Sequence, residues 1–201
     1  MEHYYTQNPQ SPRDIKSISF KIKDMFLELY TDSSVFSKTK VDYGSEILIK
    51  SLPELSGNIL DLGCGYGVIG LSLAKLYPES QVTLVDINQR AVELTLRNIE
   101  RNQIKNANAH VSNGFQQVDG LFNTIVSNPP IRAGKNIIYP LFEQSINYLH
   151  PGGSLYLVIQ KRQGAKSAVA KLQSIFGNCR VIYKQGGYWI LESTKISAQS
   201  G

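Results

Sequence analysis

The chain has 201 residues and a mass of 22.4 kDa, which suits one α/β domain with a buried core but not two independent ones. Hydrophobic residues make up 42% and charged residues 18%, a balance that excludes a disordered or fibrous protein. The sequence has no apolar run near the ~20 residues of a membrane span and no signal-peptide pattern at its start, so we expect a cytoplasmic protein. Two cysteines and three dispersed histidines predict neither a disulfide framework nor a metal site.

Positive charge is concentrated in the C-terminal third of the chain. The net charge is +5, but residues 1–130 carry 12 basic and 14 acidic side chains, whereas residues 131–201 carry 9 basic and 2 acidic ones. A one-sided basic segment is typical of proteins that bind polyanions. A solvated basic surface is the alternative interpretation.

The first 50 residues predict an extension that precedes a regular core. Residues 1–16 are polar and without periodicity, so we expect an irregular lead-in. Residues 17–32 alternate apolar and polar side chains about a turn at 23–24, which indicates a β-hairpin. A short helix capped by Ser45 is expected at 43–50.

After the extension, short apolar strands alternate with amphipathic helices. The strands are expected at 58–63, 81–87, 107–111, 121–128, 154–160, 181–184 and 188–192. The helices are expected at 68–77, 88–102, 136–150 and about 164–176. The second helix begins at an Asn88 cap and places Val92, Leu96 and Ile99 on one apolar face, and the Pro-Gly-Gly at 151–153 ends the third.

This alternation predicts an α/β fold with a doubly wound sheet. The sheet should be mostly parallel and seven-stranded, with one antiparallel strand near the end, because the last two strands follow one another across a Gly-Gly turn. We expect a single domain over residues 1–201, with the hairpin and helix extension at 1–50, the core at 51–192 and a frayed tail at 193–201.

A glycine-rich turn joins the first core strand to its helix. Gly63, Gly65 and Gly67 allow a tight turn and a close approach of the backbone to a ligand. Asp61 precedes this turn, and Asp86 ends the next strand, where a carboxylate can accept hydrogen bonds from both hydroxyls of a ribose. A helix N-terminal acid stabilised by the dipole is the alternative for Asp86.

The G-x-G-x-G order of this turn, with Cys64 and Tyr66 between the glycines, resembles the first motif of class I S-adenosylmethionine-dependent methyltransferases. The ligand of that motif has an amino-acid end and no phosphate. We interpret Cys64 as a small filler rather than a nucleophile, because no histidine or other base is near it in sequence.

The sequence Asn128-Pro129-Pro130-Ile131 stands at the tip of the fourth strand. Pro129 keeps Asn128 extended, and both prolines lack an N–H, so the turn presents acceptors without competing donors. The side-chain oxygen of Asn128 and a proline carbonyl can accept the two hydrogens of a planar amino group. This geometry points to methyl transfer onto such an amine by positioning, although an Asn-Pro-Pro turn can also serve only to end a strand.

These motifs together resemble the methyltransferase small domain family, which includes bacterial small-subunit ribosomal RNA guanine-N2 methyltransferases. The resemblance runs through VFSKTKVDYGSEILIKSLP (35–53), ILDLGCGYGVIGL (59–71), VDIN (85–88), SNG (112–114) and SNPPIRAGK (127–135) and covers nearly the whole chain. It implies a Rossmann-like class I methyltransferase fold with S-adenosylmethionine as the cofactor.

The resemblance also assigns positions around the cofactor. The 61–67 loop would meet the methionine portion, Asp86 the ribose and Asn113 the adenine, and Phe36 and Asp42 would border the pocket. Hairpin packing for Phe36 and a local helix cap for Asp42 are the alternatives. The expected cofactor-binding residues are Phe36, Asp42, Asp61, Gly63, Cys64, Gly65, Tyr66, Gly67, Asp86, Ile87, Asn113, Gly114 and Asn128.

The sequence departs from the family pattern in two places. Many amino-group methyltransferases with this motif carry an aromatic residue after the prolines to stack on the target base, and this chain has Ile131. Longer family members also carry a second, related domain that is absent from these 201 residues.

The leading hypothesis is an RNA methyltransferase that acts on an exocyclic amine, foremost guanine N2 in ribosomal RNA. Arg132 and Lys135 follow the fourth strand and Lys161 and Arg162 the fifth, so all four should lie at the sheet edge that carries the site and contact phosphates. Methylation of a protein glutamine at its amide nitrogen is a second enzymatic hypothesis. A non-catalytic S-adenosylmethionine-binding partner subunit is a third, which an intact Asn-Pro-Pro disfavours.

Overall fold

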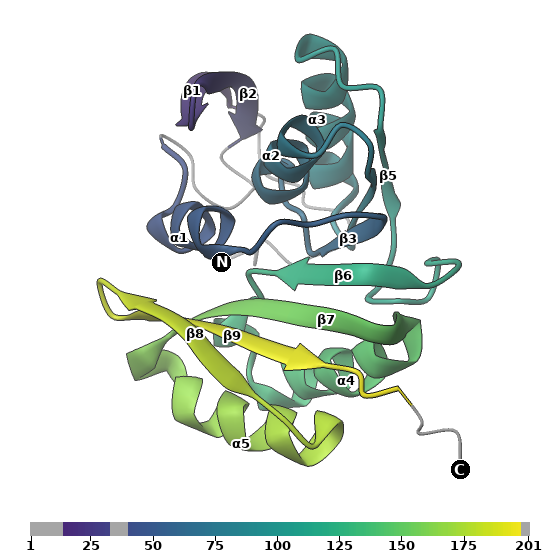
Figure 1. The fold of residues 1–201 in the computed structure, drawn as a ribbon. Helices are drawn as coiled ribbons and strands as arrows, with labels where there is room; N and C mark the ends of the chain where they lie inside the picture. The colour runs from purple at the N-terminus through teal and green to yellow at the C-terminus, as the bar shows by residue number, and fades with distance from the viewer. Residues whose placement is uncertain (1–13, 33–39, 198–201) are drawn as a thin grey trace.

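The computed structural model describes residues 14–32 and 40–197, and it shows one large sheet with helices on both faces and a separate hairpin (Figure 1). The strands are β1 (Ile15–Ile22), β2 (Met25–Asp32), β3 (Asn58–Leu62), β4 (Gln81–Asp86), β5 (Ala107–Val111), β6 (Phe122–Ser127), β7 (Leu149–Gln160), β8 (Arg180–Gln185) and β9 (Tyr188–Thr194). The helices are α1 (Tyr43–Ser51), α2 (Val68–Leu76), α3 (Gln89–Arg101), α4 (Lys135–Ser145) and α5 (Ala165–Phe176), with short 3-10 turns η1 (Ile131–Ala133), η2 (Ile146–Tyr148) and η3 (Lys161–Gln163).

The large sheet has seven strands in the order β5-β4-β3-β6-β7-β9-β8. Neighbours from β5 to β7 are parallel, and β9 runs antiparallel to both β7 and β8. The predicted doubly wound sheet with one antiparallel strand is therefore confirmed. The chain winds outward from β3 in one direction and from β6 in the other, so the switch point of the topology lies between β3 and β6, where open α/β sheets bind their ligands.

Two hydrophobic cores lie on opposite faces of the sheet. On one face, α1, α2 and α3 and the hairpin share a core with side chains such as Ile47, Leu71 and Leu94. On the other face, α4 and α5 pack Phe142 and Leu172 against the strands (Figure 1). The central strands are buried on both sides because helices cover both faces, which explains their continuous apolar runs.

The N-terminal hairpin is attached to the core through asparagine side chains of α3. The backbone N–H of Tyr30 donates to Asn98 Oδ1 at 2.7 Å, and Asn98 Nδ2 donates back to the Tyr30 carbonyl at 3.1 Å. Asn102 makes the same pair of bonds with Glu28, at 2.9 and 2.8 Å. Each amide thus takes the place of a neighbouring strand at the edge of β2, which satisfies backbone groups that would otherwise stay unpaired.

The structure corrects two details of the predicted helices. Asp42, not Ser45, is the N-cap of α1, since its side chain accepts from the Ser45 backbone N–H at 3.0 Å. Leu96 is 47% exposed, whereas Val92 is buried and Ile99 packs against the core as expected. The buried stripe also includes Leu94 and the polar side chains of Thr95 and Asn98. Those two polar residues hide the true stripe from a search for apolar periodicity.

Two predicted boundaries also shift. Helix α4 ends at Ser145, and the Pro-Gly-Gly at 151–153 lies within β7, where the pairing with β6 is interrupted by a bulge. The Gly152 N–H donates to the Lys195 carbonyl at 2.8 Å, so this segment joins the sheet margin instead of ending a helix. Strand β9 continues through Thr194, two residues into the expected frayed tail.

Candidate active site

Four loops meet at the carboxyl ends of neighbouring parallel strands. They carry Gly63–Gly67 after β3, Asp86–Ile87 at the end of β4, Asn113–Gly114 after β5, and Asn128–Ile131 after β6. The order of the strands therefore gathers the predicted site residues along one edge of the sheet. Phe36 lies outside the described residues.

The glycine loop after β3 is held against β4 by backbone bonds. The N–H groups of Gly63 and Cys64 both donate to the Val85 carbonyl, at 2.8 and 2.9 Å. Gly63 has a φ of 77°, and no atom lies within 4 Å of the position that a Cβ would take, so its surface is open to a ligand. Gly67 has a φ of 91°, and a Cβ there would stand 2.9 Å from Thr95, so a glycine is needed for the turn into α2.

Residues of α3 brace this loop from behind. Thr95 Oγ1 donates to the Gly65 carbonyl at 2.9 Å, and Asn98 Nδ2 donates to the Tyr66 carbonyl at 2.8 Å. Asn98 also holds the hairpin, so one buried side chain connects the extension to the glycine loop. The sequence analysis missed both residues, and polar side chains inside an amphipathic helix were the only local signal.

Asp86 connects the glycine loop to the start of α3. Its Oδ2 accepts from the Gly65 N–H at 2.9 Å, and its Oδ1 accepts from the Asn88 N–H at 2.8 Å. Burial raises the pKa of Asp86, and these two backbone donors oppose the shift. The Ile87 N–H is a third backbone donor to this carboxylate, so of its roughly four acceptor sites one remains for a hydroxyl of a ligand. The helix cap itself is Asn88, which accepts from the N–H groups of Arg90 and Ala91.

Asp61 is fully buried beneath the glycine loop. Its Oδ2 accepts from the Gly70 N–H at 2.8 Å, whereas its buried Oδ1 has no hydrogen-bond partner among the residues that the structure describes. Burial raises the pKa of Asp61 to about 7; the Gly70 N–H lowers it, and the charge of Asp86 adds a small further rise. A buried acceptor without a donor favours binding of a cationic group at this point.

Asn128 has its amide fixed by the N-terminus of α1. Its Nδ2 donates to Asp42 Oδ1 and to Ser45 Oγ, both at 3.1 Å. Both hydrogens of the amide are thereby used, and the amide oxygen meets no donor within residues 14–32 and 40–197. Asp42 is thus both the cap of α1 and a partner of the Asn-Pro-Pro turn, and Ser45, which was predicted only as a cap, is a second partner.

Local hydrogen bonds and backbone geometry shape the rest of the Asn-Pro-Pro turn and the neighbouring strand ends. The Ile131 N–H donates to the Pro129 carbonyl and the Ala133 N–H to the Pro130 carbonyl, both at 2.8 Å, which forms η1. Ser127 Oγ donates to the Leu62 carbonyl at 2.6 Å and joins β6 to β3 at the switch point. Asn113 is exposed at the end of β5, next to Gly114 at a φ of 59°.

Cys64 fills space inside the glycine loop. It is 6% exposed, and its Sγ lies 3.8 Å from Thr95 Oγ1. Burial raises the pKa of this thiol well above its usual range, and the charges of Asp86 and Asp61 add to the rise, so the thiol is held in its unreactive, protonated form. Within the described ranges, no three His, Cys, Asp or Glu side chains gather in a way that could hold a metal ion. No helix in those ranges is long and apolar enough to cross a membrane.

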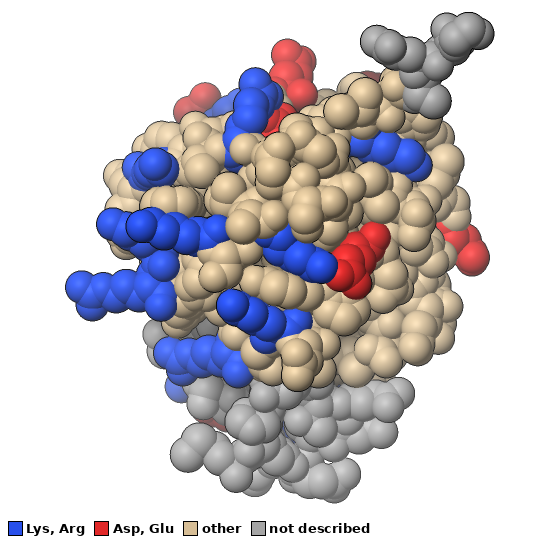
Figure 2. Space-filling model, turned by 90° about the horizontal axis from the view of Figure 1, so that it is seen from below, with Lys and Arg blue, Asp and Glu red and all other residues tan. Residues whose placement is uncertain are grey.

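Basic residues border the carboxyl edge on the α4 and α5 side. Arg132 lies in η1, Lys135 begins α4, and Lys161 and Arg162 lie in η3, all with exposed side chains. Figure 2 shows Lys and Arg gathered toward one side of the face seen from below, with few acidic side chains among them. The predicted juxtaposition of these four residues with the sheet edge is thus present in the fold.

Comparisons with known proteins agree with this architecture. A family profile described as the methyltransferase small domain matches residues 26–192. The uncharacterized protein YbxB of Bacillus subtilis (strain 168) is 44% identical over 199 residues, 97% of this chain and 99% of its own length.

Two solved structures extend the comparison. The T. thermophilus 16S rRNA N2 guanine methyltransferase RsmC, solved with AdoMet and guanosine, has a TM-score of 0.82 at 27% identity. That match covers 93% of this chain and 52% of RsmC, so the chain spans about half the length of that protein. A methyltransferase from Pyrococcus furiosus has a TM-score of 0.66 at 25% identity, over 76% of this chain and 81% of that one.

The fold, the glycine loop and these likenesses define an S-adenosylmethionine-dependent methyltransferase of class I. More specifically, the chain belongs to the methyltransferase small domain family. Its cofactor is S-adenosyl-L-methionine, and the residues at the edge fit that molecule. The unpartnered oxygen of Asp61 suits an ammonium group, the open surface of Gly63 admits a close ligand, and Asp86 keeps an acceptor site for a hydroxyl.

Proposed function

We propose that this protein methylates the exocyclic amine of a guanine, at N2, in ribosomal RNA. The observation that carries the proposal is the fixed amide of Asn128, with its Nδ2 bound to Asp42 and Ser45. The likeness to RsmC supports guanine N2 as the acceptor, since that protein acts on N2 of a guanine in 16S rRNA.

The orientation of the Asn128 amide determines which atom an incoming amine would meet. If the amide were flipped, its oxygen would face the Asp42 carboxylate and the charge-assisted hydrogen bond to Asp42 would be lost, whereas the Ser45 hydroxyl can donate to either end of the amide. Such bonds contribute about 0.5–1.5 kcal/mol when neutral and about 1.5–3 kcal/mol when one partner is charged. The observed orientation is therefore favoured by about 1.5–3 kcal/mol, the contribution of the bond to Asp42, so the oxygen is held ready to accept from the amine. A fixed acceptor can align the nitrogen lone pair for in-line displacement without a strong base.

The cofactor roles follow from the same edge of the sheet. S-adenosylmethionine supplies an electrophilic methyl group on a sulfonium. We expect Asp86, with Ile87 beside it, to bind the ribose hydroxyls and Asn113 and Gly114 to border the adenine. Asp61 and the loop at 63–67 would hold the methionine portion.

The basic residues beside the site would bind the phosphates of the RNA. Arg132, Lys135, Lys161 and Arg162 form no ion pair with a carboxylate in the described part of the chain. If all four contact phosphates of a single strand, their replacement by Ala should reduce the slope of log K against log salt by about 2.8, at about 0.7 per contact. An unchanged slope would show that these residues form only a solvated surface.

The experiment is methyl transfer from labelled S-adenosylmethionine onto ribosomal RNA, both naked and in assembled subunits, with nucleoside analysis of the product. The proposal predicts label in N2-methylguanosine. Label in a ribosomal protein would support glutamine methylation instead. No transfer to either, with cofactor binding retained in calorimetry, would support a non-catalytic binding subunit.

A further inference from the structure

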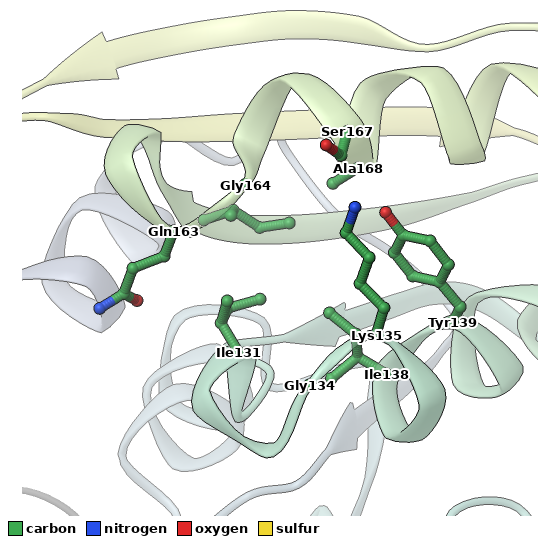
Figure 3. Close-up of a pocket in the computed structure, with 10 residues that line it drawn as sticks. Ile131, Gly134, Lys135, Ile138, Tyr139, Gln163, Gly164, Ser167 and Ala168 are labelled. Atoms are coloured by element: carbon green, nitrogen blue, oxygen red, sulfur yellow. The ribbon is translucent and has the colours of Figure 1, made fainter.

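A pocket of about 310 Å³ opens beside the candidate active site, between the segments that follow β6 and β7. Figure 3 shows its walls: Ile131 from η1, Ile138 and Tyr139 from α4, and Gly164, Ser167 and Ala168 from the start of α5. Its volume is at the lower end of small-molecule pockets, about 300–1000 Å³, which suits one nucleotide-sized group.

The register of the sheet places this pocket level with Asn128. Ser127 of β6 pairs with Leu157 of β7, so Ile159 in the pocket wall lies one residue beyond the level of Asn128. Ile131 is three residues after Asn128, which limits their Cα separation to about 11 Å in a fully extended chain, and the turn shortens this. Ile131 therefore belongs both to the turn that follows Asn128 and to the pocket wall, which places the pocket on the α4 and α5 side of that turn.

The walls are mostly apolar, and Lys135 is the one charged side chain among the described residues that line the pocket. Figure 3 shows this side chain extending from α4 toward α5, and its Nζ lies 5.9 Å from the centre of the Tyr139 ring. Apolar walls with a cation beside them suit a base attached to a phosphate.

The charge of the surrounding elements also favours a polyanion. Between residues 131 and 176 the chain has six Lys or Arg side chains and one acid, Glu143. Glu143 is paired with Lys171, so it does not offset the other cations near the mouth. A neutral ligand would gain nothing from this positive charge, whereas an RNA strand gains at each phosphate.

We propose that this pocket binds the base of the nucleotide next to the methylated one, with Lys135 on its phosphate. The proposal rests on RNA as the substrate and adds a subsite that selects an unstacked neighbour. It also gives Ile131 a function, as an apolar wall between the site at Asn128 and the pocket, which explains why an aliphatic residue can follow the prolines.

The test is binding of fluorescein-labelled UUGUU RNA, measured by anisotropy with S-adenosylhomocysteine present, beside two RNAs that are abasic 5′ or 3′ of the guanosine. The wild type should bind one of the two abasic RNAs about five- to twentyfold more weakly than the intact RNA. Ser167→Phe, which fills the pocket, should remove this difference. Ser174→Phe, an exposed position on the same helix, is the matched control and should preserve it.

Two results would overturn the subsite: equal binding of all three RNAs by the wild type, or a discrimination that survives Ser167→Phe. If that variant fails to fold, Lys135→Gln decides, because it should lower the salt slope by about 0.7 for the intact RNA. An unchanged slope would contradict the proposed phosphate contact. This binding assay does not depend on methyl transfer, which is measured separately on ribosomal RNA. A protein that discriminates the three RNAs here but methylates no guanine in that separate assay refutes the proposed function alone. Active protein without discrimination refutes the subsite alone.

Discussion

Replacing Asn128 by Asp should destabilise the folded protein, because a carboxylate oxygen then replaces the Nδ2 that lies 3.1 Å from Asp42 Oδ1. At that distance two like charges repel by about 1 kcal/mol in bulk water and by about 5 kcal/mol at an effective dielectric constant near 20. Protonation of the introduced carboxyl limits the cost to about 4 kcal/mol at pH 7, which is the cost of raising its pKa from about 3.9 to 7. We therefore expect a loss of about 1–4 kcal/mol at pH 7.

The direction of the pH dependence follows from the same contact. Asp42 raises the pKa of the introduced carboxyl in the folded state, so the folded variant holds more protons than the unfolded chain above about pH 4. Stability relative to the wild type should fall as the pH rises from about 4 to 8. Urea denaturation across this range measures it.

A second substitution makes the test specific. Combining Asn128→Asp with Asp42→Asn leaves one negative charge in place of two, and the pair should recover part of the lost stability at pH 7. Asp42→Asn alone is the control and should cost little, because Asn caps a helix about as well as Asp. Full stability of Asn128→Asp at pH 8, or no recovery in the double variant, would refute the contact between α1 and the Asn-Pro-Pro turn.

Three further predictions concern the cofactor side of the site. Asp86→Ala should weaken binding of S-adenosylmethionine in calorimetry by about 1.5–3 kcal/mol, as for a lost charge-assisted hydrogen bond, and unchanged affinity would remove Asp86 from the site. Without cofactor, the free energy of unfolding of the wild type should fall by up to about 4 kcal/mol as the pH rises from about 4 through 7, because burial raises the pKa of Asp61 to about 7. In urea denaturation, Asp61→Asn should lose this dependence of stability on pH. A dependence that remains in the variant would belong to another group. Asn98→Ala removes hydrogen bonds to both backbone groups of Tyr30 and to the Tyr66 carbonyl, so it should lower the free energy of unfolding by about 2–4 kcal/mol. An unchanged unfolding midpoint would show that Asn98 does not hold the hairpin.

Site residues could be predicted from the sequence wherever they stand at the end of a strand. Gly63, Asp86 and Asn128 each stand at the end of a strand with a strong apolar pattern, and parallel strands bring such positions to one edge whatever the details of packing. The seven strands and the antiparallel β9 were predictable for the same reason, because buried parallel strands and a Gly-Gly turn leave clear local patterns.

Contacts between distant segments were not predictable. Asp42 and Asn128 are 86 residues apart, and nothing in their local sequences indicates that one holds the amide of the other. Thr95 and Asn98 look like solvent-facing residues of α3, although both are buried and bind loop carbonyls. Periodicity detects apolar burial, whereas these residues are buried through hydrogen bonds that form only in the folded chain.

The central claim is that the side-chain oxygen of Asn128 orients the acceptor amine. Its most direct test is the single-turnover rate of methyl transfer to ribosomal RNA by Asn128→Ala, with cofactor affinity measured in parallel. The variant should fold and bind S-adenosylmethionine as the wild type does but lose most of the transfer, because positioning supplies much of the rate. A wild-type rate in Asn128→Ala would contradict the account.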